Sequence, residues 1–130
     1  MEKNFDAWNI KKKVIHTEKK RPFFHVREIW WCALGVNVGF EQDGIGENFE
    51  RPIIVMQGFN KDLFLGAALT TKRKEGKYYF PIGSINGKDS FVILSQVRLI
   101  DAKRLMNKIG TIDKKTFEKL KSAMEAALFK

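Results

Sequence analysis

The chain has 130 residues, of which 44% are hydrophobic, and a formal net charge of +9 at pH 7. This length supports one hydrophobic core but is short for two domains, and the apolar runs fall well below the roughly 20 residues of a membrane-spanning helix. A single cysteine excludes a disulfide within the chain, and the N-terminus lacks the apolar segment of a signal peptide. These features predict a soluble, cytoplasmic, single-domain protein that has no membrane partner.

Positive charge is distributed unevenly along the chain. Residues 1–27 carry eight basic and three acidic side chains, and residues 51–130 carry sixteen and seven. Residues 28–50 contain five carboxylates and no Lys or Arg. A large basic excess is typical of proteins that bind a polyanion such as nucleic acid, although basic side chains also serve solubility alone.

The first element in chain order is a basic N-terminal extension, residues 1–25. Its apolar side chains have the spacing of a short, imperfect amphipathic helix: Phe5, Trp8, Ile10, Val14 and Ile15. The remaining residues, 26–130, are expected to form the domain itself.

Five short segments rich in aromatic and branched residues predict an antiparallel sheet: Val26–Leu34, Pro52–Gln57, Leu63–Thr70, Lys77–Ile82 and Ser90–Leu99. Asn86-Gly87 predicts a type I′ hairpin turn between the last two, because both residues tolerate positive φ angles. The first segment is apolar on both faces, which favours a small closed or half-closed barrel over an open sheet.

Two further patterns concern the C-terminal half. In the last strand, Phe91, Ile93 and Val97 are expected on one face and Gln96 and Arg98 together on the other. Beyond it, Asp113 is a plausible N-cap of a helix. That helix presents an apolar stripe at helical spacing: Phe117, Leu120, Met124 and Leu128.

Several kinds of active site are disfavoured by the residue inventory. Two histidines and one cysteine offer no familiar zinc-ligand spacing, and the scattered carboxylates do not resemble a magnesium nuclease centre. No phosphate-binding glycine motif is present, since Gly44 and Gly46 lie in the acidic stretch without a following Lys-Ser/Thr. A nuclease using His16 and His25 as an acid–base pair is possible in principle, but both lie in or beside the extension.

Several segments, in order, resemble PemK/MazF-type toxins over about residues 27–128. They are Glu28–Gly35, Gly39, Glu41-Gln42, Arg51–Val55, Ala67–Thr70, Ser90–Arg98, Ile100-Asp101, Lys103–Leu105 and Ile109-Gly110. The resemblance implies a mostly β fold with a C-terminal helix, a small antiparallel src-homology-3-like barrel of the PemK/MazF/CcdB toxin type. Residues 44–50 are an insertion of roughly five residues relative to the family pattern.

The resemblance also implies a function. A homodimeric, sequence-selective endoribonuclease would cleave single-stranded RNA without metal or other cofactor, leaving 2′,3′-cyclic phosphate and 5′-hydroxyl ends. A cognate acidic antitoxin would neutralise it, and operator DNA would be bound only by the toxin–antitoxin complex. The alternative is a non-catalytic module of the same fold that binds nucleic acid or poisons gyrase; a regulatory DNA binder is weaker, since no helix-turn-helix pattern is seen.

Carried over residue by residue, the resemblance makes Arg51 and Thr70 the catalytic pair, and Glu41 a candidate for orienting reacting groups. A guanidinium offers a planar fork of donors to phosphate oxygens, but its pKa of more than about 12 makes it a poor general base. We therefore expect Arg51 to stabilise charge or donate a proton, Thr70 to hold a phosphate oxygen and Glu41 to accept the 2′-hydroxyl proton.

The remaining predicted site residues would contact RNA. Phe40 is a loop aromatic suited to base stacking, whereas Trp30 and Trp31 are expected mainly in the core. The other candidates offer amide, hydroxyl or cationic groups to bases and phosphates: Gln42, Thr71, Lys72, Arg73, Gln96 and Arg98.

Overall fold

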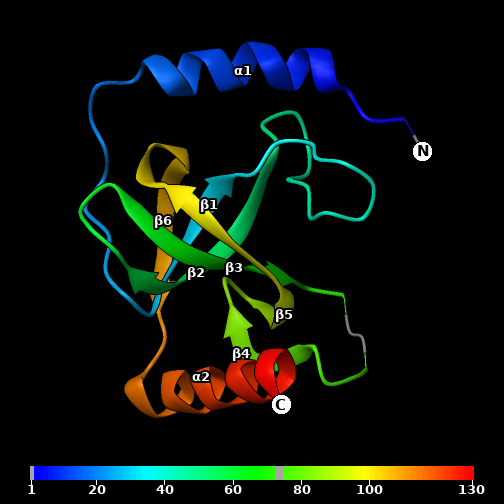
Figure 1. Ribbon diagram of the computed structural model, residues 1–130, viewed down its shortest axis with the longest axis vertical. Helices are drawn as coiled ribbons and strands as arrows, with labels where there is room; N and C mark the ends of the chain where they lie inside the picture. The colour runs from blue at the N-terminus through cyan, green and yellow to red at the C-terminus, as the bar shows by residue number, and fades with distance from the viewer. Residues whose placement is uncertain (1, 73–74) are drawn as a thin grey trace.

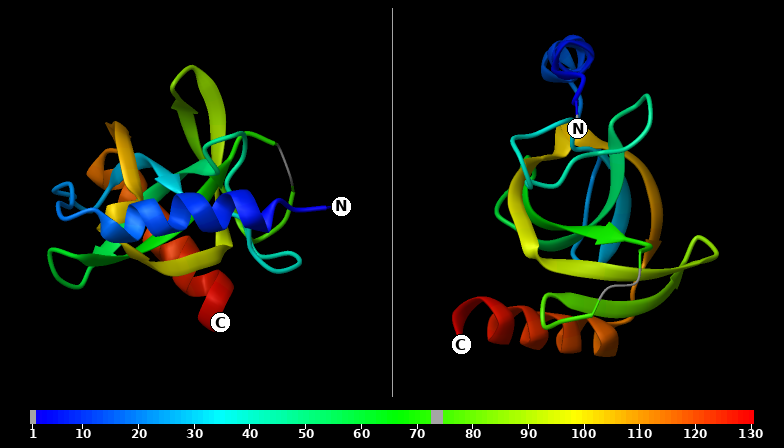
Figure 2. Two further views of the ribbon diagram at one scale, coloured as in Figure 1. Left: turned by 90° about the horizontal axis from the view of Figure 1, so that it is seen from above. Right: turned by 90° about the vertical axis from the view of Figure 1, so that its right-hand side faces the viewer.

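The computed structural model describes residues 2–72 and 75–130. Its elements, in chain order, are α1 (Phe5–Thr17), β1 (Glu28–Ala33), β2 (Glu50–Gly58), β3 (Leu63–Thr70), β4 (Tyr79–Ile85), β5 (Lys88–Asp101), the 3₁₀ turn η1 (Ala102–Arg104), β6 (Leu105–Thr111) and α2 (Lys114–Phe129). The six strands form one antiparallel sheet in the order β4-β5-β3-β2-β1-β6. The sheet curls into a half-barrel, with α1 and α2 at opposite ends (Figures 1 and 2). The predicted mostly β fold with two terminal helices is confirmed.

Strand β1 is buried on both faces, as its sequence predicts. Ile29 belongs to a cluster of buried side chains that α2 covers through Phe117 and Leu120. Trp30 and Cys32 belong to a second cluster on the opposite side of the strand. Because successive side chains of a strand point to opposite faces, one apolar strand contributes to both halves of the core.

Strand β6 is absent from the sequence prediction. It pairs with β1 across two register shifts, and of its seven residues only Leu105 is buried. Such a segment lacks the alternation that marks a half-buried strand, so its conformation depends on pairing with β1 rather than on local preference.

The expectation that Phe91, Ile93 and Val97 share one face of β5 is wrong. The β3–β5 register passes from Ala67 opposite Val97 to Leu69 opposite Val92, so β5 carries extra residues between these pairs. Ile93 joins the cluster that contains Trp30, whereas Val97 packs with the cluster under α2. An irregularity of this kind breaks the two-residue period, because the bulged strand bends between the two pairs.

The predicted local signals at the β4–β5 turn and at α2 are confirmed. Asn86 and Gly87 have φ angles of 53° and 80°, as a type I′ turn requires. The Asp113 side chain caps α2 by accepting a hydrogen bond from the Thr116 amide at 2.7 Å. The apolar stripe of α2 packs on the sheet, and each fully buried side chain of this kind contributes about 1.5–3 kcal/mol before entropy. In the part of the chain that the structure describes, neither helix has the length and apolarity needed to cross a membrane.

Candidate active site

Arg51 and Thr70 lie beside each other at the ends of adjacent strands. The β2–β3 ladder pairs Ile53 with Ala68 and Ile54 with Ala67, and continuing this register by two residues places Arg51 opposite Thr70. Both residues line a groove of about 530 Å³. The pairing therefore brings the two expected catalytic side chains to one surface.

Other parts of the chain form the walls of this groove. The segment between β1 and β2 contributes Phe40 and Gln42, and the β4–β5 hairpin contributes Asn86 and Lys88. Phe40 is fully exposed, so its ring is free to stack on a ligand such as a base. The groove thus combines a cationic side, an exposed aromatic ring and amide groups.

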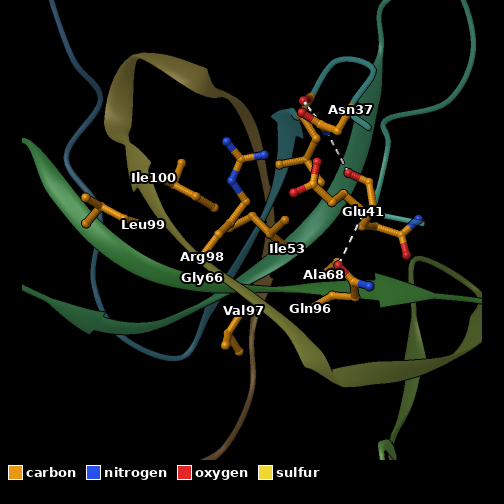
Figure 3. Close-up of a pocket in the computed structure, with 12 residues that line it drawn as sticks. Asn37, Glu41, Ile53, Gly66, Ala68, Gln96, Val97, Arg98, Leu99 and Ile100 are labelled. Carbon is orange, nitrogen blue, oxygen red and sulfur yellow. Dashed lines mark hydrogen bonds between the residues drawn. The ribbon is translucent and has the colours of Figure 1, made fainter. Parts of the chain in front are cut away.

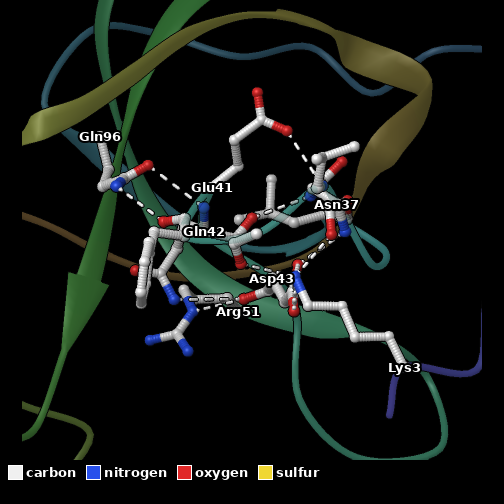
Figure 4. Close-up of polar contacts among 11 residues, drawn as sticks. Lys3, Asn37, Glu41, Gln42, Asp43, Arg51 and Gln96 are labelled. Atoms are coloured by element: carbon white, nitrogen blue, oxygen red, sulfur yellow. Dashed lines mark hydrogen bonds and ion pairs between the residues drawn. The ribbon is translucent and has the colours of Figure 1, made fainter. Parts of the chain in front are cut away.

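The Arg51 guanidinium is held by main-chain carbonyl groups. Its Nε donates to the Asp43 carbonyl oxygen at 2.7 Å (Figure 4), and its Nη1 donates to the Leu69 carbonyl oxygen at 3.1 Å. Burial lowers the pKa of Arg51, and the nearby Asp43 carboxylate opposes that change. The side chain is therefore fixed in direction, with carbonyl partners that accept only from its N–H groups.

Gln42 lies directly against Arg51. With the amide oriented so that its oxygen faces the guanidinium, that oxygen accepts from Nε at 3.0 Å and from Nη2 at 2.8 Å. This orientation satisfies both groups, since the opposite one would place two donors against each other. Gln42, expected as an RNA contact, is thus placed to orient the arginine.

The residues after β3 line the same side of the groove. The Thr70 hydroxyl oxygen accepts a hydrogen bond from the Lys72 amide at 3.2 Å, which fixes a tight turn at the strand end. Thr71 and Lys72 are exposed and line the groove. Arg73, the next predicted RNA contact, lies outside the described residues.

Glu41 is not brought to the Arg51–Thr70 groove. Its carboxylate accepts from the Val38 amide at 3.0 Å and lies on the side of the loop away from the Arg51 guanidinium (Figure 4). It lines an adjoining pocket of about 400 Å³ together with Arg98 (Figure 3). Gln96 and Arg98, which were predicted to lie side by side, both line this pocket.

Two amide side chains connect the pocket and the groove. Gln42 and Gln96 line both, and the Gln96 side-chain oxygen accepts from the main-chain N–H of Gln42 at 3.2 Å. The Gln96 side-chain nitrogen donates to the Phe40 carbonyl oxygen at 3.4 Å. An extended ligand lying across both cavities would therefore pass over these two glutamines.

Sequence reasoning did not identify three residues of this region. Asp43 holds the loop against Arg51, and Asn86 and Lys88 extend the groove from the hairpin. The Asn86-Gly87 turn is visible in the sequence, but only the sheet order places it near β3. Trp31, expected mainly in the core, is half-buried and also lines the groove.

The other reactive side chains lie elsewhere. His16 and His25 line neither the groove nor the adjoining pocket, and His25 contacts the Glu28 carboxylate at 3.3 Å. Cys32 is fully buried, and burial raises the pKa of its thiol to about 12. Among residues 2–72 and 75–130, no three His, Cys, Asp or Glu side chains are grouped as metal ligands.

Comparison with known proteins gives one consistent family. Residues 25–128 match the family model described as PemK-like, MazF-like toxin of type II toxin-antitoxin system. Endoribonuclease EndoA from Bacillus subtilis (strain 168) is 29% identical over 111 residues, covering 78% of this chain and 90% of EndoA.

Solved structures agree in fold at low sequence identity. MazF from Deinococcus radiodurans superposes with a TM-score of 0.64 at 14% identity, covering 82% of this chain and 97% of MazF. An endoribonuclease in complex with its cognate antitoxin, from Mycobacterial species, gives a TM-score of 0.60 at 16% identity over 82% of this chain and 94% of that one. Because the family model spans the whole barrel and α2, the chain belongs to the PemK-like, MazF-like toxins of type II toxin–antitoxin systems.

Proposed function

We propose that this toxin is an endoribonuclease that cleaves single-stranded RNA, with Arg51 and Thr70 at the cleavage site. The observation that carries the proposal is the fixed guanidinium of Arg51 beside Thr70 in a groove lined by an exposed aromatic ring. The similarity of the chain to Endoribonuclease EndoA and its membership of the toxin family support the same class of reaction.

The proposed reaction uses the RNA's own 2′-hydroxyl as nucleophile. The 2′-oxygen forms a bond to the adjacent phosphorus and loses its proton, while the bond from phosphorus to the 5′-oxygen breaks and that oxygen takes up a proton. The products are a 2′,3′-cyclic phosphate and a free 5′-hydroxyl. No further reactant is needed, since every atom comes from the RNA and every proton moves to or from a side chain or water.

Negative charge accumulates on the phosphate oxygens during this reaction. The N–H groups of Arg51 that face the groove would donate to these oxygens, and the Thr70 hydroxyl group would donate to one of them. Both groups are already fixed before RNA binds, so little reorganisation is required when the charge develops.

Glu41 is the proposed acceptor of the 2′-hydroxyl proton. Its carboxylate faces the adjoining pocket rather than the groove, so the Glu41 side chain would have to turn toward Arg51 when RNA binds. The base must lie within hydrogen-bond reach of the 2′-hydroxyl, which is itself about 3–3.5 Å from the phosphorus that it attacks. Replacing Glu41 by glutamine removes the base and keeps the shape. A pH–rate profile that is unchanged in Glu41→Gln would exclude this role.

The biological setting follows from the family. We propose that the toxin works in the cytoplasm as a homodimer and that a cognate acidic antitoxin neutralises it, with operator DNA bound only by the pair. Phe40, Lys72 and Arg98 would contact the RNA substrate, the first by stacking and the others by charge.

The test incubates the purified protein with a long single-stranded RNA in EDTA and maps the product ends. We expect fragments with 5′-hydroxyl ends, and a loss of cleavage of about 10²-fold or more in Arg51→Ala. Lys119→Ala, which removes one exposed positive charge from α2, is the matched control and should cleave normally. RNA that stays intact but tightly bound would refute the proposal in favour of a non-catalytic binding module.

A further inference from the structure

The N-terminal extension contacts the segment that holds Arg51. Lys3 places its ammonium against three groups of the β1–β2 segment: the Asn37 carbonyl oxygen, the Gly39 carbonyl oxygen at 2.9 Å and the Asp43 carboxylate at 3.0 Å (Figure 4). The Lys3 side chain is only 14% exposed and that of Asp43 24%. This is a shielded interaction with several acceptors, which distinguishes it from an ordinary surface ion pair.

Asp43 connects Lys3 to the arginine. Its carboxylate accepts from the Lys3 ammonium and from the main-chain N–H of Asn37, the latter at 2.6 Å. Its main-chain carbonyl oxygen accepts from Arg51 Nε at 2.7 Å. One residue therefore joins the extension, the loop and the candidate catalytic side chain.

Two side chains of α1 pack on the same segment as Lys3. Trp8 is 6% exposed, and its ring centroid lies 5.6 Å from that of Phe49. Gly35 lies beneath the indole, where an added Cβ would come within 2.0 Å of the ring, so only glycine permits this contact. Lys11 donates to the Asn48 carbonyl oxygen and lies 3.7 Å from the Glu50 carboxylate.

The extension is also attached to the barrel away from the loop. Arg21 makes a two-point contact with the Asp101 carboxylate at 2.8 and 2.9 Å, and Lys103 donates to the His16 carbonyl oxygen at 2.9 Å. The start of the helix is fixed as well, because the Asn4 side chain caps it by accepting from the Ala7 amide at 3.0 Å. Lys3 thus precedes a capped helix that is attached to the barrel beyond its C-terminal end and through Trp8.

We infer that Lys3 is a positioning residue of the active site, acting through Asp43 on Arg51, with Trp8 and Lys11 supporting the same segment. The inference rests on the proposed function, since it assigns a catalytic consequence to the contact. The segment from 34 to 49 has no long strand of its own, and its closure depends on a few bonds, such as those from the Gly44 amide to the Gly35 carbonyl oxygen and from Ile45 to Glu50. A loop of this kind opens readily unless side chains from elsewhere restrain it.

The test compares three full-length variants. Lys3→Met keeps the aliphatic stem and removes the charge, and Lys3→Arg restores a cation. Lys12→Met removes an exposed charge from α1, in the same extension, and is the matched control. Two measurements are made on each: hydrogen exchange of the main-chain amides of Asn37 and Gly44, and RNA cleavage at a range of RNA concentrations, which gives kcat and KM.

In Lys3→Met we expect exchange at these two amides to accelerate about tenfold, because a hydrogen-bonded charged contact restrains the loop. The cleavage rate should fall about tenfold while KM changes less than about twofold, since the RNA contacts remain and only the arrangement of Arg51 is affected. Lys3→Arg should recover most of both, and Lys12→Met should match the unmodified protein.

Unchanged exchange in Lys3→Met would overturn the inference, as would faster exchange with an unchanged cleavage rate or with a change confined to KM. If the unmodified protein leaves RNA intact, the proposed function fails and the catalytic part of the inference fails with it. The exchange comparison would still decide whether Lys3 restrains the loop, so the two failures are distinguishable.

Discussion

Replacing Arg51 by lysine keeps the positive charge but removes the planar fork of donors. In the structure Nε donates to the Asp43 carbonyl oxygen at 2.7 Å and Nη1 to the Leu69 carbonyl oxygen at 3.1 Å, which leaves Nη2 directed at Gln42 and the groove. A single ammonium group at the end of a flexible stem cannot meet both carbonyls and still present a donor to a phosphate oxygen. Lysine must therefore give up either its anchors or its contact with the substrate.

The expected cost follows from these donors. Loss of one preorganised donor to a developing oxyanion reduces the rate by about 10²–10³-fold, or about 2.7–4 kcal/mol of transition-state stabilisation. A carbonyl left without its partner would also cost about 1–3 kcal/mol of folding free energy if it stays buried. We thus expect Arg51→Lys to be folded, slightly less stable and nearly as inactive as Arg51→Ala.

The assay is single-turnover cleavage of an end-labelled RNA at saturating protein, with thermal unfolding followed in parallel. Single-turnover conditions report the chemical step rather than product release. If Arg51→Lys cleaves within about threefold of the unmodified protein while remaining folded, positive charge alone suffices and the argument from the fixed fork of donors is refuted.

Three further predictions concern the rest of the molecule. Because burial raises the pKa of the Cys32 thiol to about 12, the thiol stays protonated at pH 8 and should resist iodoacetamide until the protein unfolds; rapid labelling of the native state would contradict this. Leu120 is fully buried, so Leu120→Ala should lower the free energy of unfolding in urea by about 3 kcal/mol, and a loss below about 1 kcal/mol would mean that α2 is not docked as described. Burial opposes ionisation of Glu28, but hydrogen bonds from Lys108 and from two N–H donors outweigh it and lower the pKa of the carboxyl. The stability that ionised Glu28 contributes to the folded state is present above its unfolded pKa of about 4.3 and is lost as the pH falls through the lower folded pKa. Glu28→Gln should therefore show a flatter decline of Tm below about pH 5, and an equally steep decline would exclude a contribution from Glu28.

The parts of the fold that were predictable are those with local signals. The Asn86-Gly87 turn, the Asp113 cap and the two-sided apolar strand β1 each need only a few neighbouring residues, and each is confirmed. Strand β6 and the irregularity in β5 carry no such signal, because both depend on which strand lies alongside. Single-sequence patterns describe burial and turns well but do not contain the register between distant strands.

The candidate site likewise has parts that the sequence predicts and parts that it does not. Arg51 and Thr70 come together because β2 and β3 are consecutive strands of a hairpin, which is the simplest pairing to expect. Glu41 lies in an irregular segment, and its direction is decided by a hydrogen bond to the Val38 amide that composition does not reveal. Lys3 lies 40 positions from Asp43 in the sequence, so its contact could not be read from spacing.

The acidic composition of residues 28–50 has a physical consequence at Arg51. Burial favours the neutral form of the guanidinium and lowers its pKa, whereas the Asp43 carboxylate favours the cation. The carbonyl oxygens of Asp43 and Leu69 act in the same direction, because they accept hydrogen bonds and would face a lone pair if the arginine lost a proton to become a base. Removal of the 2′-hydroxyl proton by Arg51 would therefore work against every neighbour that fixes its position. The acidic loop, unsuited by its charge to hold phosphate, instead favours the cationic form of Arg51. In the proposed reaction, proton removal is therefore left to a different group.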